Sequence, residues 1–547
     1  MLPQSGGWGN FLDTPLGSAS LTGEHFRCRR RAHTYRLLAP LRGRAKHELD
    51  LTLIQAITSP SMTAAPIDLK ARARQAMLEA GFKPDFPAEV TREVLGLKGR
   101  SAKPADSEAR DLRSLLWSSI DNDTSRDLDQ VEYVESLNGG GTRLLVGIAD
   151  VDALVSRGSA TDRQAAIETT SVYTGVATFP MLPGELSTDL TSLLDAQDRL
   201  SMVIELHIQD SGDVVSHEVY PAWLRNRAKL AYSSTGAWLE GQGQMPAAVA
   251  ATPGLEAQLR LQQMTSERLR GLRKQHGALE FSSVEATPVV ENGEVKELAI
   301  RHHNVAESII EGFMVAANVG MAQFLKEKGS ISLRRVVRTP KRWDRIQAIA
   351  AQFGVKLPAM PEPLALSQFL EQRKAADPEH FQDLSLTIVK LLGPGEYIVE
   401  APGTEHEGHF GLAVQDYTHS TAPNRRYADL VTQRLLKAAT AGQPAAYLPA
   451  ELSQIAAHCT EREDAARKVE RLMRKVAAAC LLSRRVGEVF DGVITGASPK
   501  GTYARLMKLP AEGRVVRGER GIDVGDKVRV RLVSVDVSKG FIDFERI

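Results

Sequence analysis

The stretch Ser118-Ser-Ile-Asp121-Asn-Asp123-Thr-Ser-Arg126-Asp127-Leu-Asp129-Gln130 is the most informative part of this sequence. Four carboxylates fall within nine residues, directly after a β-prone segment. Like charges that lie close together repel, and burying them is costly unless a cation compensates. Carboxylate oxygens suit Mg²⁺, and two such ions about 3.5–4 Å apart can activate a water and stabilise the leaving oxygen of a phosphodiester. The spacing is therefore compatible with a divalent-cation site.

Two other interpretations of this loop stay open when it is taken by itself. An isolated acidic loop is often simply a solvated surface segment. Asp121, Asp123, Ser125 and Glu132 also fall at positions one, three, five and twelve of an EF-hand calcium loop, but Arg126 stands at position six, where that loop requires Gly. The flanks also resemble strands rather than helices, so calcium binding is the weakest of the three interpretations.

Length and composition place the chain among ordinary globular proteins. Its 547 residues suggest three or four domain-sized units, at about 100–200 residues each. The net charge of +1 provides no overall basic field, so a nucleic-acid partner would need locally concentrated cations. The sequence shows neither an apolar run of about 18 residues nor a secretory signal, and Cys28, Cys459 and Cys480 form no metal or disulfide pattern. We therefore expect a cytoplasmic protein without a membrane span.

The N-terminal part divides into two segments. Residues 1–61 lack regular patterning and are expected to be a poorly organised extension. From 66 to 80, apolar residues at helical spacing predict a helix that ends near Gly81, and a second short helix is expected after Pro87. Residues 62–105 are thus predicted to be a small helical domain, either a helix-turn-helix relative or, more simply, a packing appendage.

The middle of the chain mixes strand and helix patterns, and the tail is β-rich. Gly212-Asp213 predicts a hairpin turn between two β-prone runs, and Asn304 with Glu307 forms a capping-box pattern at the start of a strong helix. From about 487, several short β-prone runs predict a small barrel. The predicted segments are strands at 143–149 and 202–208, helices at 256–274 and 304–326, a helix after Asp429, a long helix at about 452–486, and tail strands at 489–494, 503–506, 527–535 and 541–545.

Eight sequence blocks in order resemble the catalytic (RNB) domain of the RNase II/RNase R exoribonucleases. Each block alone is weak, but the ordered set is specific, and the resemblance extends from about 85 to 547. The blocks are Asp121-x5-Asp127-Leu-Asp129, Ile148-Ala-Asp-Val151, Phe179-Pro-Met-Leu-Pro183-x-Glu-Leu-Ser-Thr-Asp-Leu190, Arg227-Ala-Lys-Leu-Ala-Tyr232, Gly277-Ala-Leu-Glu-Phe281, Ile310-Glu-Gly-Phe-Met-Val-Ala-Ala-Asn318, His409-Phe-Gly-Leu412 and Thr421-Ala-Pro-Asn-Arg425-Arg-Tyr-Ala-Asp429.

The resemblance implies a multidomain α/β protein. The RNB catalytic domain would cover 106–486, and a ribosomal S-one-type OB barrel that binds RNA would cover 487–547. The implied activity is processive 3′-to-5′ hydrolysis of single-stranded RNA to nucleoside 5′-monophosphates, in RNA turnover. Mg²⁺ is the implied cofactor, with two ions when substrate is bound. The protein is expected to be a monomer. DNA is expected to be bound at most, and to be cut poorly.

The resemblance also implies roles for individual residues in catalysis. Asp121, Asp127 and Asp129 would bind Mg²⁺ at the scissile phosphate, with Asp129 the most critical acid. Arg425 matches the family's catalytic arginine, whose guanidinium fork suits the charge that builds on phosphoryl oxygens. The family usually has a fourth Asp where this chain has Gln130. A Gln carbonyl can hold a metal or its water but brings no charge, so another acid, such as Asp123, could compensate.

Further matched residues would bind RNA. Tyr173 and Phe281 match aromatic residues that sandwich the terminal bases, an interaction that ignores base identity. Tyr232 and Glu311 match residues that hold ribose hydroxyls, which DNA lacks at the 2′ position. Glu470 matches an acid near the last nucleotide, although a helix-surface acid is nearly as good an interpretation. In the tail, Lys500 and Tyr503 are candidates for single-strand contacts.

Two other functions remain as alternatives. A non-catalytic RNA-binding protein with a degenerate RNB domain is favoured by Gln130 and by Ala422-Pro423-Asn424, which departs from the family's Ser-Pro-Ile. The retained acids and Arg425 argue against it. A DNA exonuclease is the second alternative, and a comparison of DNA and RNA as substrates would decide between the two.

Overall fold

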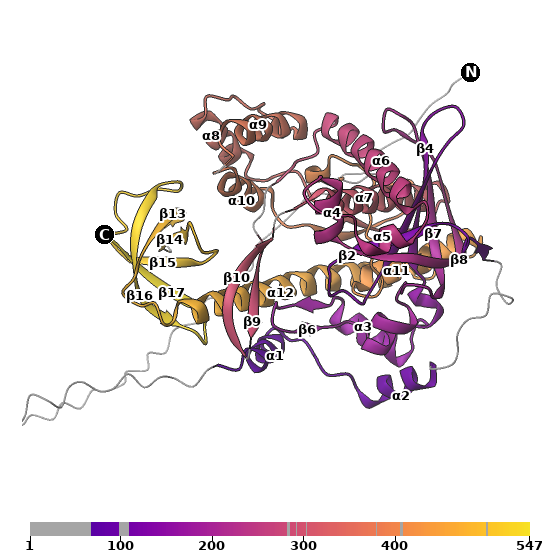
Figure 1. Cartoon of the computed structure of the whole chain (residues 1–547), viewed down its shortest axis with the longest axis horizontal. Coiled ribbons are helices and arrows are strands. Elements are labelled where there is room, and N and C mark those ends of the chain that lie inside the picture. Colours follow the sequence, from indigo (N-terminus) through magenta and orange to yellow (C-terminus); the bar gives the residue numbers. More distant parts are fainter. Residues whose placement is uncertain are drawn as a thin grey trace, which may run out of the picture. The chain divides into compact units, whose positions relative to one another are not determined.

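The computed structural model describes residues 67–97, 109–281, 285–291, 293–301, 303–378, 380–404, 408–498 and 501–547 (Figure 1). The predictions for residues 1–61, the Lys500 contact, and parts of the 62–105 segment lie outside the described residues.

A six-stranded sheet lies in the main hydrophobic core, in the order β1-β8-β2-β3-β4-β7, with an additional pairing of β7 with β8. The β7–β8 hairpin pairs Ile208 with Val214, as the turn pattern predicted. Gly212 in this turn has φ +95°, and a Cβ there would lie 2.5 Å from the carbonyl oxygen of Arg268. Both the left-handed backbone conformation and the close approach of Arg268 therefore require glycine at this position. The strands are β1 (Arg110–Asp111), β2 (Trp117–Asp121), β3 (Gln130–Ser136), β4 (Thr142–Ala149), β7 (Asp198–Ile208) and β8 (Val214–Ala231).

Strand pairing at one end of this sheet brings distant residues together. Strand β2 runs parallel to β8, with Asp121 paired to Ala231. The next residue along the chain is Tyr232, the first residue of α4 (Tyr232–Leu239). Strand β3 runs antiparallel to β2, so its first residue, Gln130, lies toward the same end of the sheet as Asp121.

Three helices pack on the sheet and bury its apolar side chains: α6 (Leu255–Gln275), α7 (Val305–Glu327) and α11 (Tyr427–Thr440). The capping box predicted for α7 is present, with Asn304 and Glu307 bonded reciprocally at 2.9 and 3.2 Å. By length and composition α7 could also cross a membrane, but 67% of its apolar window is buried inside the fold, as in the core helix of a globular protein.

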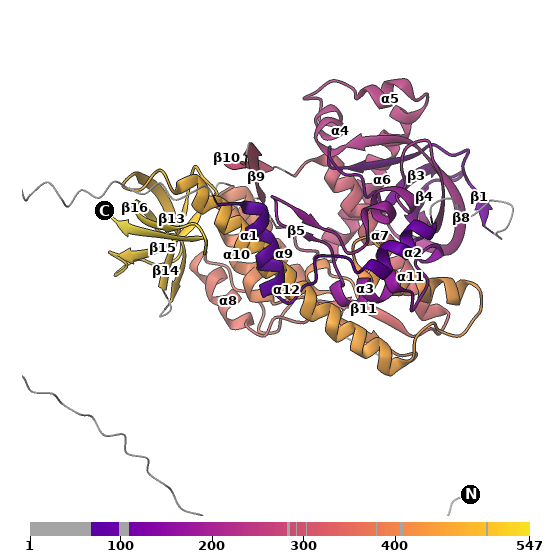
Figure 2. The same ribbon diagram turned by 90° about the horizontal axis from the view of Figure 1, so that it is seen from below.

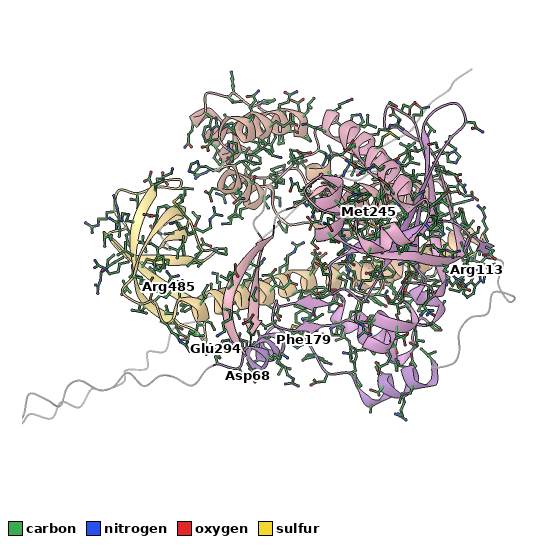
Figure 3. The ribbon with its side chains drawn as sticks, viewed as in Figure 1. Asp68, Arg113, Phe179, Met245, Glu294 and Arg485 are labelled. Carbon is green, nitrogen blue, oxygen red and sulfur yellow. The ribbon has the colours of Figure 1, made fainter. Side chains whose placement is uncertain are left out.

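The two N-terminal helices, α1 (Leu69–Glu79) and α2 (Ala88–Leu97), are formed as predicted. They join different cores. Helix α1 packs on the long helix α12 (Pro449–Leu482) in a cluster that also includes the C-terminal barrel, whereas Val90 and Val94 of α2 belong to the main core. Figure 2 shows α1 alongside α12, and Figure 3 labels Asp68, whose carboxylate caps α1.

The remaining elements surround this framework. Helices α8 (Trp343–Gln352), α9 (Pro363–Ala376) and α10 (Phe381–Leu392) share a third hydrophobic core. The others are α3 (Ala160–Glu168), α5 (Ala247–Ala251) and the strand pairs β5 (Val172–Tyr173) with β6 (Thr178–Phe179), β9 (Glu285–Glu291) with β10 (Glu294–Arg301), and β11 (Ser332–Val336) with β12 (Glu396–Glu400).

The tail forms a closed barrel in the order β13-β14-β15-β17-β16, which confirms the predicted fold class. Strand β15 was missed because its sequence, Glu512-Gly-Arg-Val-Val-Arg517, carries few apolar residues, although Gly513 and Val515 alternate into the barrel core. The strands are β13 (Val489–Ser498), β14 (Gly501–Leu506), β15 (Glu512–Arg517), β16 (Lys527–Asp536) and β17 (Phe541–Arg546).

Candidate active site

The acidic loop joins β2 to β3 and is pinned to the core at Leu128. Asp121 ends β2, Asp127 and Asp129 lie in the loop, and Leu128 between them is only 1% exposed. The backbone N–H of Leu128 donates to Ser192 Oγ at 3.0 Å, and its carbonyl accepts from the N–H of Leu193 at 3.0 Å. Burial of this leucine between two acids holds their backbone in place, which a purely solvated loop would not show.

Asp121 is half-buried and held by its own loop. Its Oδ1 accepts hydrogen bonds from the N–H of Asn122 at 2.6 Å and from Ser125 Oγ at 3.0 Å. Burial raises the pKa of Asp121, and the charge of Asp127 raises it further, whereas these hydrogen bonds and Arg425 oppose the rise. The ionised carboxylate is thus short of positive charge.

Asp129 is 2% exposed and is the most deeply buried of the three acids. Its Oδ1 accepts from the N–H of Asn424 at 3.1 Å, and its Oδ2 accepts from Arg425 Nε at 3.1 Å. Burial raises the pKa of Asp129 to about 7, although Arg425 and the Asn424 N–H act to lower it. A further cation near this carboxylate would favour its ionised form.

The segment that carries Arg425 is fixed by a buried carboxylate. Asp429 is 0% exposed, and its Oδ1 accepts from the N–H of Ala422 at 2.8 Å and from Arg426 Nη2 at 2.7 Å. The N–H of Ser171 donates to the carbonyl of Arg425 at 2.9 Å, which ties the segment to the strand that carries Tyr173. Asp429 therefore holds the turn that presents Arg425.

Asn424, one of the departures from the family pattern, is bonded to Thr191. The Oγ1 of Thr191 donates to Asn424 Oδ1 at 2.5 Å, a separation typical of an O–H···O hydrogen bond, and lies 2.8 Å from the carbonyl oxygen of Leu186. The Thr191 hydroxyl therefore holds the side chain of Asn424. Thr191 was not predicted, since it directly follows the block that ends at Leu190 and carries no recognisable signal.

Tyr173 links the acidic loop to the long helix α12. Its hydroxyl donates to Asp127 Oδ2 at 3.3 Å, and its backbone N–H donates to Glu470 Oε1 at 3.1 Å. Tyr173 is 44% exposed, so its ring can still receive another ring. The structure therefore brings Tyr173 to the acidic loop and Glu470 to the backbone of Tyr173, and the RNA contacts that the resemblance implied for both stay predictions.

Tyr232 also lies in the electric field of the acids. Burial raises the pKa of its hydroxyl, and the charges of Asp121 and Glu132 raise it further. This follows from the pairing of β2 with β8, which sets Tyr232 directly after the partner of Asp121.

The other predicted site residues lie elsewhere or at the margin. Phe281 packs against the third hydrophobic core, and Glu311 has a 59% exposed side chain whose Oε2 lies 3.8 Å from His303 Nε2. Tyr503 is 36% exposed on β14, and Gln130 is 8% exposed at the start of β3. The RNA contacts of Phe281, Glu311 and Tyr503 stay predictions, as does the metal-site role of Gln130.

The donor set suits a hard divalent cation, although the acids are not yet gathered around one point. Within the described residues, no three His, Cys, Asp or Glu side chains stand in a metal-binding arrangement. The three aspartates instead use hydrogen bonds to Ser125, Tyr173 and Arg425. Three carboxylates on one loop, with the pKa values of Asp121 and Asp129 raised by burial, are donors whose charge Mg²⁺ would compensate.

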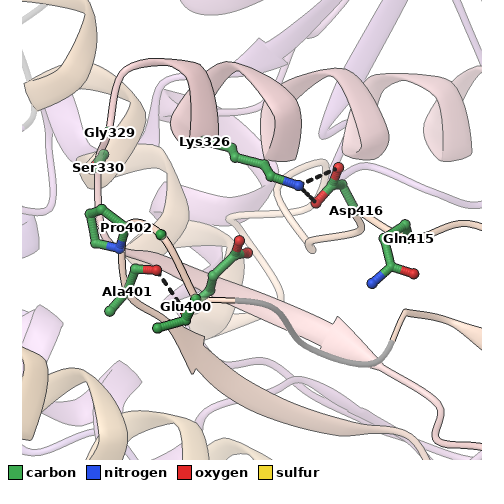
Figure 4. A pocket seen from close by; sticks show the side chains of 10 residues that line it. Lys326, Gly329, Ser330, Glu400, Ala401, Pro402, Gln415 and Asp416 are labelled. Carbon is green, nitrogen blue, oxygen red and sulfur yellow. Dashed lines mark hydrogen bonds and ion pairs between the residues drawn. The ribbon is translucent and has the colours of Figure 1, made fainter.

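A separate polar pocket of about 680 Å³ lies at the C-terminal end of α7 (Figure 4). Its acids are already neutralised, because Lys326 Nζ lies 3.1 Å from Asp416 Oδ1 and Arg334 is bonded to Glu400. The residues that line it include none from the acidic loop, so it is distinct from the candidate site.

Comparison with known proteins identifies the family. Residues 109–442 match the RNB domain, and residues 488–547 match the RNase II-type exonuclease C-terminal S1 domain. Ribonuclease R of Thermotoga maritima is 30% identical over 497 residues, which cover 84% of this chain and 68% of that protein.

Solved structures share the fold. Mycoplasma genitalium RNase R, in complex with ribose-methylated single-stranded RNA, has a TM-score of 0.79 and 24% identity, covering 88% of this chain and 78% of that chain. Yeast Ssd1, a pseudonuclease, has a TM-score of 0.64 and 16% identity, covering 84% of this chain and 57% of that chain. By the extent of the RNB match and the identity to Ribonuclease R, this chain belongs to the RNB family and ends in an RNase II-type S1 domain.

Proposed function

We propose that this protein is a processive exoribonuclease that hydrolyses single-stranded RNA from its 3′ end and releases nucleoside 5′-monophosphates. The observation that carries the proposal is the convergence of Asp129 and Arg425 from opposite ends of the catalytic domain, with Asp121, Asp127 and Tyr173 beside them. Surface acids of a binding protein would not need a guanidinium bonded to a carboxylate that is only 2% exposed.

Arg425 would bind the scissile phosphate. Its Nε group holds Asp129, which orients the guanidinium plane, and the two Nη groups can then donate to non-bridging phosphate oxygens. Because negative charge builds on these oxygens during in-line displacement, donors fixed beforehand stabilise the transition state more than the ground state.

Enzymes of this family depend on a metal, and we assign Mg²⁺ to the carboxylates of Asp121, Asp127 and Asp129. When bound, one or two Mg²⁺ ions would supply an activated water and a counter-charge for the leaving 3′-oxygen. The three aspartates would orient the ions, and the buried Leu128 would keep Asp127 and Asp129 aligned.

The neighbouring side chains would hold the RNA end. Stacking on Tyr173 and Phe281 is worth about 1–3 kcal/mol per base and does not depend on sequence. Tyr232 and Glu311 would bind ribose hydroxyls, so DNA would bind but be cut poorly. Glu470 would lie near the last nucleotide, and the S1 barrel, through Tyr503, would contact the incoming strand. We further propose a cytoplasmic monomer.

A non-catalytic RNA-binding role is the second candidate. Gln130 removes one expected negative charge, and the fold is shared with a pseudonuclease. The retained Asp129–Arg425 pair favours the enzyme.

The test is digestion of 5′-labelled single-stranded RNA with Mg²⁺ by the wild type and by Asp129→Asn. We expect stepwise shortening by the wild type and no shortening by the variant, which should still retard RNA on a gel. Asp123→Asn is the matched control, because Asp123 is exposed and accepts only from Ser233 Oγ in the hydrogen bonds of the described residues, at 3.0 and 3.1 Å. Intact RNA with both proteins, together with gel retardation, would establish the binding role instead. A parallel DNA strand tests the sugar preference.

A further inference from the structure

Glu132 in β3 is a buried acid for which the structure provides no neutralising partner. Its side chain is 0% exposed, and neither Oε1 nor Oε2 has a hydrogen-bond partner among the described residues. An ionised carboxylate in such a place costs several kcal/mol unless a cation compensates. The negative charge of Asp121 also acts on this buried carboxylate and adds to the cost of ionising it.

The position of Glu132 connects it to the acidic loop. It follows Gln130 by two residues on the same strand, so both side chains point to the same face of the sheet, roughly 6.6–6.8 Å apart along the strand. Its partner on the neighbouring strand β2 is Ser118, three residues before Asp121. The charges of Asp121 and Glu132 both act on the hydroxyl of Tyr232, which places all three in one electrostatic environment.

Asp123 is a weaker candidate for the missing charge at position 130. Its carboxylate is exposed to solvent and already accepts the hydroxyl proton of Ser233, which both carboxylate oxygens share at 3.0 and 3.1 Å. Solvent and Ser233 already stabilise the ionised form of Asp123, whereas ionised Glu132 would require a cation to offset its burial.

We propose that Glu132 supplies the negative charge that Gln130 lacks and helps Asp121 to hold a divalent cation in the active site. This inference rests on the proposed metal-dependent function. Side chains in strands lean along the strand direction, and a glutamate carries its carboxylate one methylene farther from the backbone than an aspartate, so both effects shorten the distance from Glu132 to position 130. Gln130 would then contribute a neutral carbonyl or hold a water of the cation.

The test is direct measurement of Mn²⁺ binding to the full chain without RNA, by electron paramagnetic resonance of the free ion. We expect Glu132→Gln, which preserves shape, to weaken Mn²⁺ binding by about 10–100-fold. Glu135→Gln is the matched control, because Glu135 lies on the same strand but is paired with Arg143 at 2.7 Å, and it should bind as the wild type does. In the double variant Gln130→Asp with Glu132→Gln, the restored acid should recover most of the lost affinity.

Melting temperatures separate metal binding from folding. Glu132→Gln should melt no lower than the wild type in EDTA, because it removes an unpaired buried acid, but should lose the increase in melting temperature that Mn²⁺ gives the wild type. Unchanged Mn²⁺ affinity in Glu132→Gln would overturn the inference and identify Glu132 as a buried neutral acid, while leaving the proposed nuclease function intact. A wild type that binds no Mn²⁺ would overturn both this inference and the metal dependence of the proposed function.

Discussion

Arg425 Nε donates a 3.1 Å hydrogen bond to Asp129 Oδ2 across a separation of 296 residues. Asp129 is 2% exposed, whereas the side chain of Arg425 remains 41% exposed. One side of the guanidinium therefore meets a buried acid, and the rest faces the space where a phosphate would lie. An arginine that binds a substrate phosphate needs this division of its N–H donors, because a fully paired arginine would have no donors left for substrate.

Replacement of Arg425 by Lys should lower kcat by about 100–1,000-fold, because a single ammonium cannot hold Asp129 and clamp phosphate oxygens together. The measurement is the single-turnover rate on labelled RNA. RNA affinity should change much less, since many other contacts would hold the strand. Arg163→Lys, at a position with a 58% exposed side chain, is the control for arginine loss. Full activity in Arg425→Lys would show that only the charge at this position matters.

Replacement of Thr191 by Val should lower kcat by about 10-fold with little effect on RNA affinity. The valine has nearly the same shape but cannot bond Asn424, whose N–H holds Asp129, so the turn that presents Arg425 should loosen. The loss of stability should be about 1–3 kcal/mol, from one buried polar group left unpaired. Thr188→Val removes only a hydroxyl bonded to Gly184 within its own turn, and should keep normal kcat. Equal kcat in the two variants would contradict this role of Thr191.

Two replacements of Tyr173 should separate its ring from its hydroxyl. Tyr173→Ala should weaken binding of single-stranded RNA by about 5–150-fold, which corresponds to loss of one stacked base. Tyr173→Phe keeps the ring and loses only the 3.3 Å bond to Asp127, so its affinity should stay within about 3-fold of the wild type. Fluorescence anisotropy in EDTA measures binding without hydrolysis. Similar weakening in both variants would assign the effect to the hydroxyl.

The fold should lose stability in mild acid because His409 is partly buried and is held in its neutral form. Burial, helped by the charge of Arg335, lowers the pKa of His409 to about 4, against about 6.5 in an unfolded chain. Between these values the unfolded state binds more protons, so the free energy of unfolding falls as pH decreases from about 6.5 toward 4. The contribution of His409 to this fall should be about 1–2 kcal/mol at pH 5.

Urea unfolding at pH 7.5 and pH 5 measures this effect. His409→Gln should show a smaller difference in unfolding free energy between the two conditions than the wild type, whereas substitution of the exposed His276 should leave the difference unchanged. His419, whose Nδ1 lies 2.7 Å from the hydroxyl of Tyr397, should contribute in the same direction, because burial lowers its pKa as well. An identical pH response of the wild type and His409→Gln would refute the assignment.

Much of the secondary structure could be predicted because it depends on local patterns. The capping box at Asn304, the turn at Gly212 and the helix that begins after Asp68 each involve residues within four positions of one another. Strand β15 was missed for the same reason, since its sequence is mostly polar and only its pairing with neighbouring strands in the closed barrel makes it a strand. Burial of Glu132 was also beyond local reasoning, because the sequence showed only one more acid near an acidic loop.

The sequence by itself determined the family, several of the main helices and strands, and the placement of Asp121, Asp127 and Asp129 on one loop, because residue types at fixed local spacing carry that information. Only the tertiary structure decided how Arg425 and Tyr232 come close to these acids, and which carboxylates lose their solvent. The physical reason is that desolvation and hydrogen bonding depend on what packs against a side chain, and those neighbours come from strands and helices hundreds of residues away.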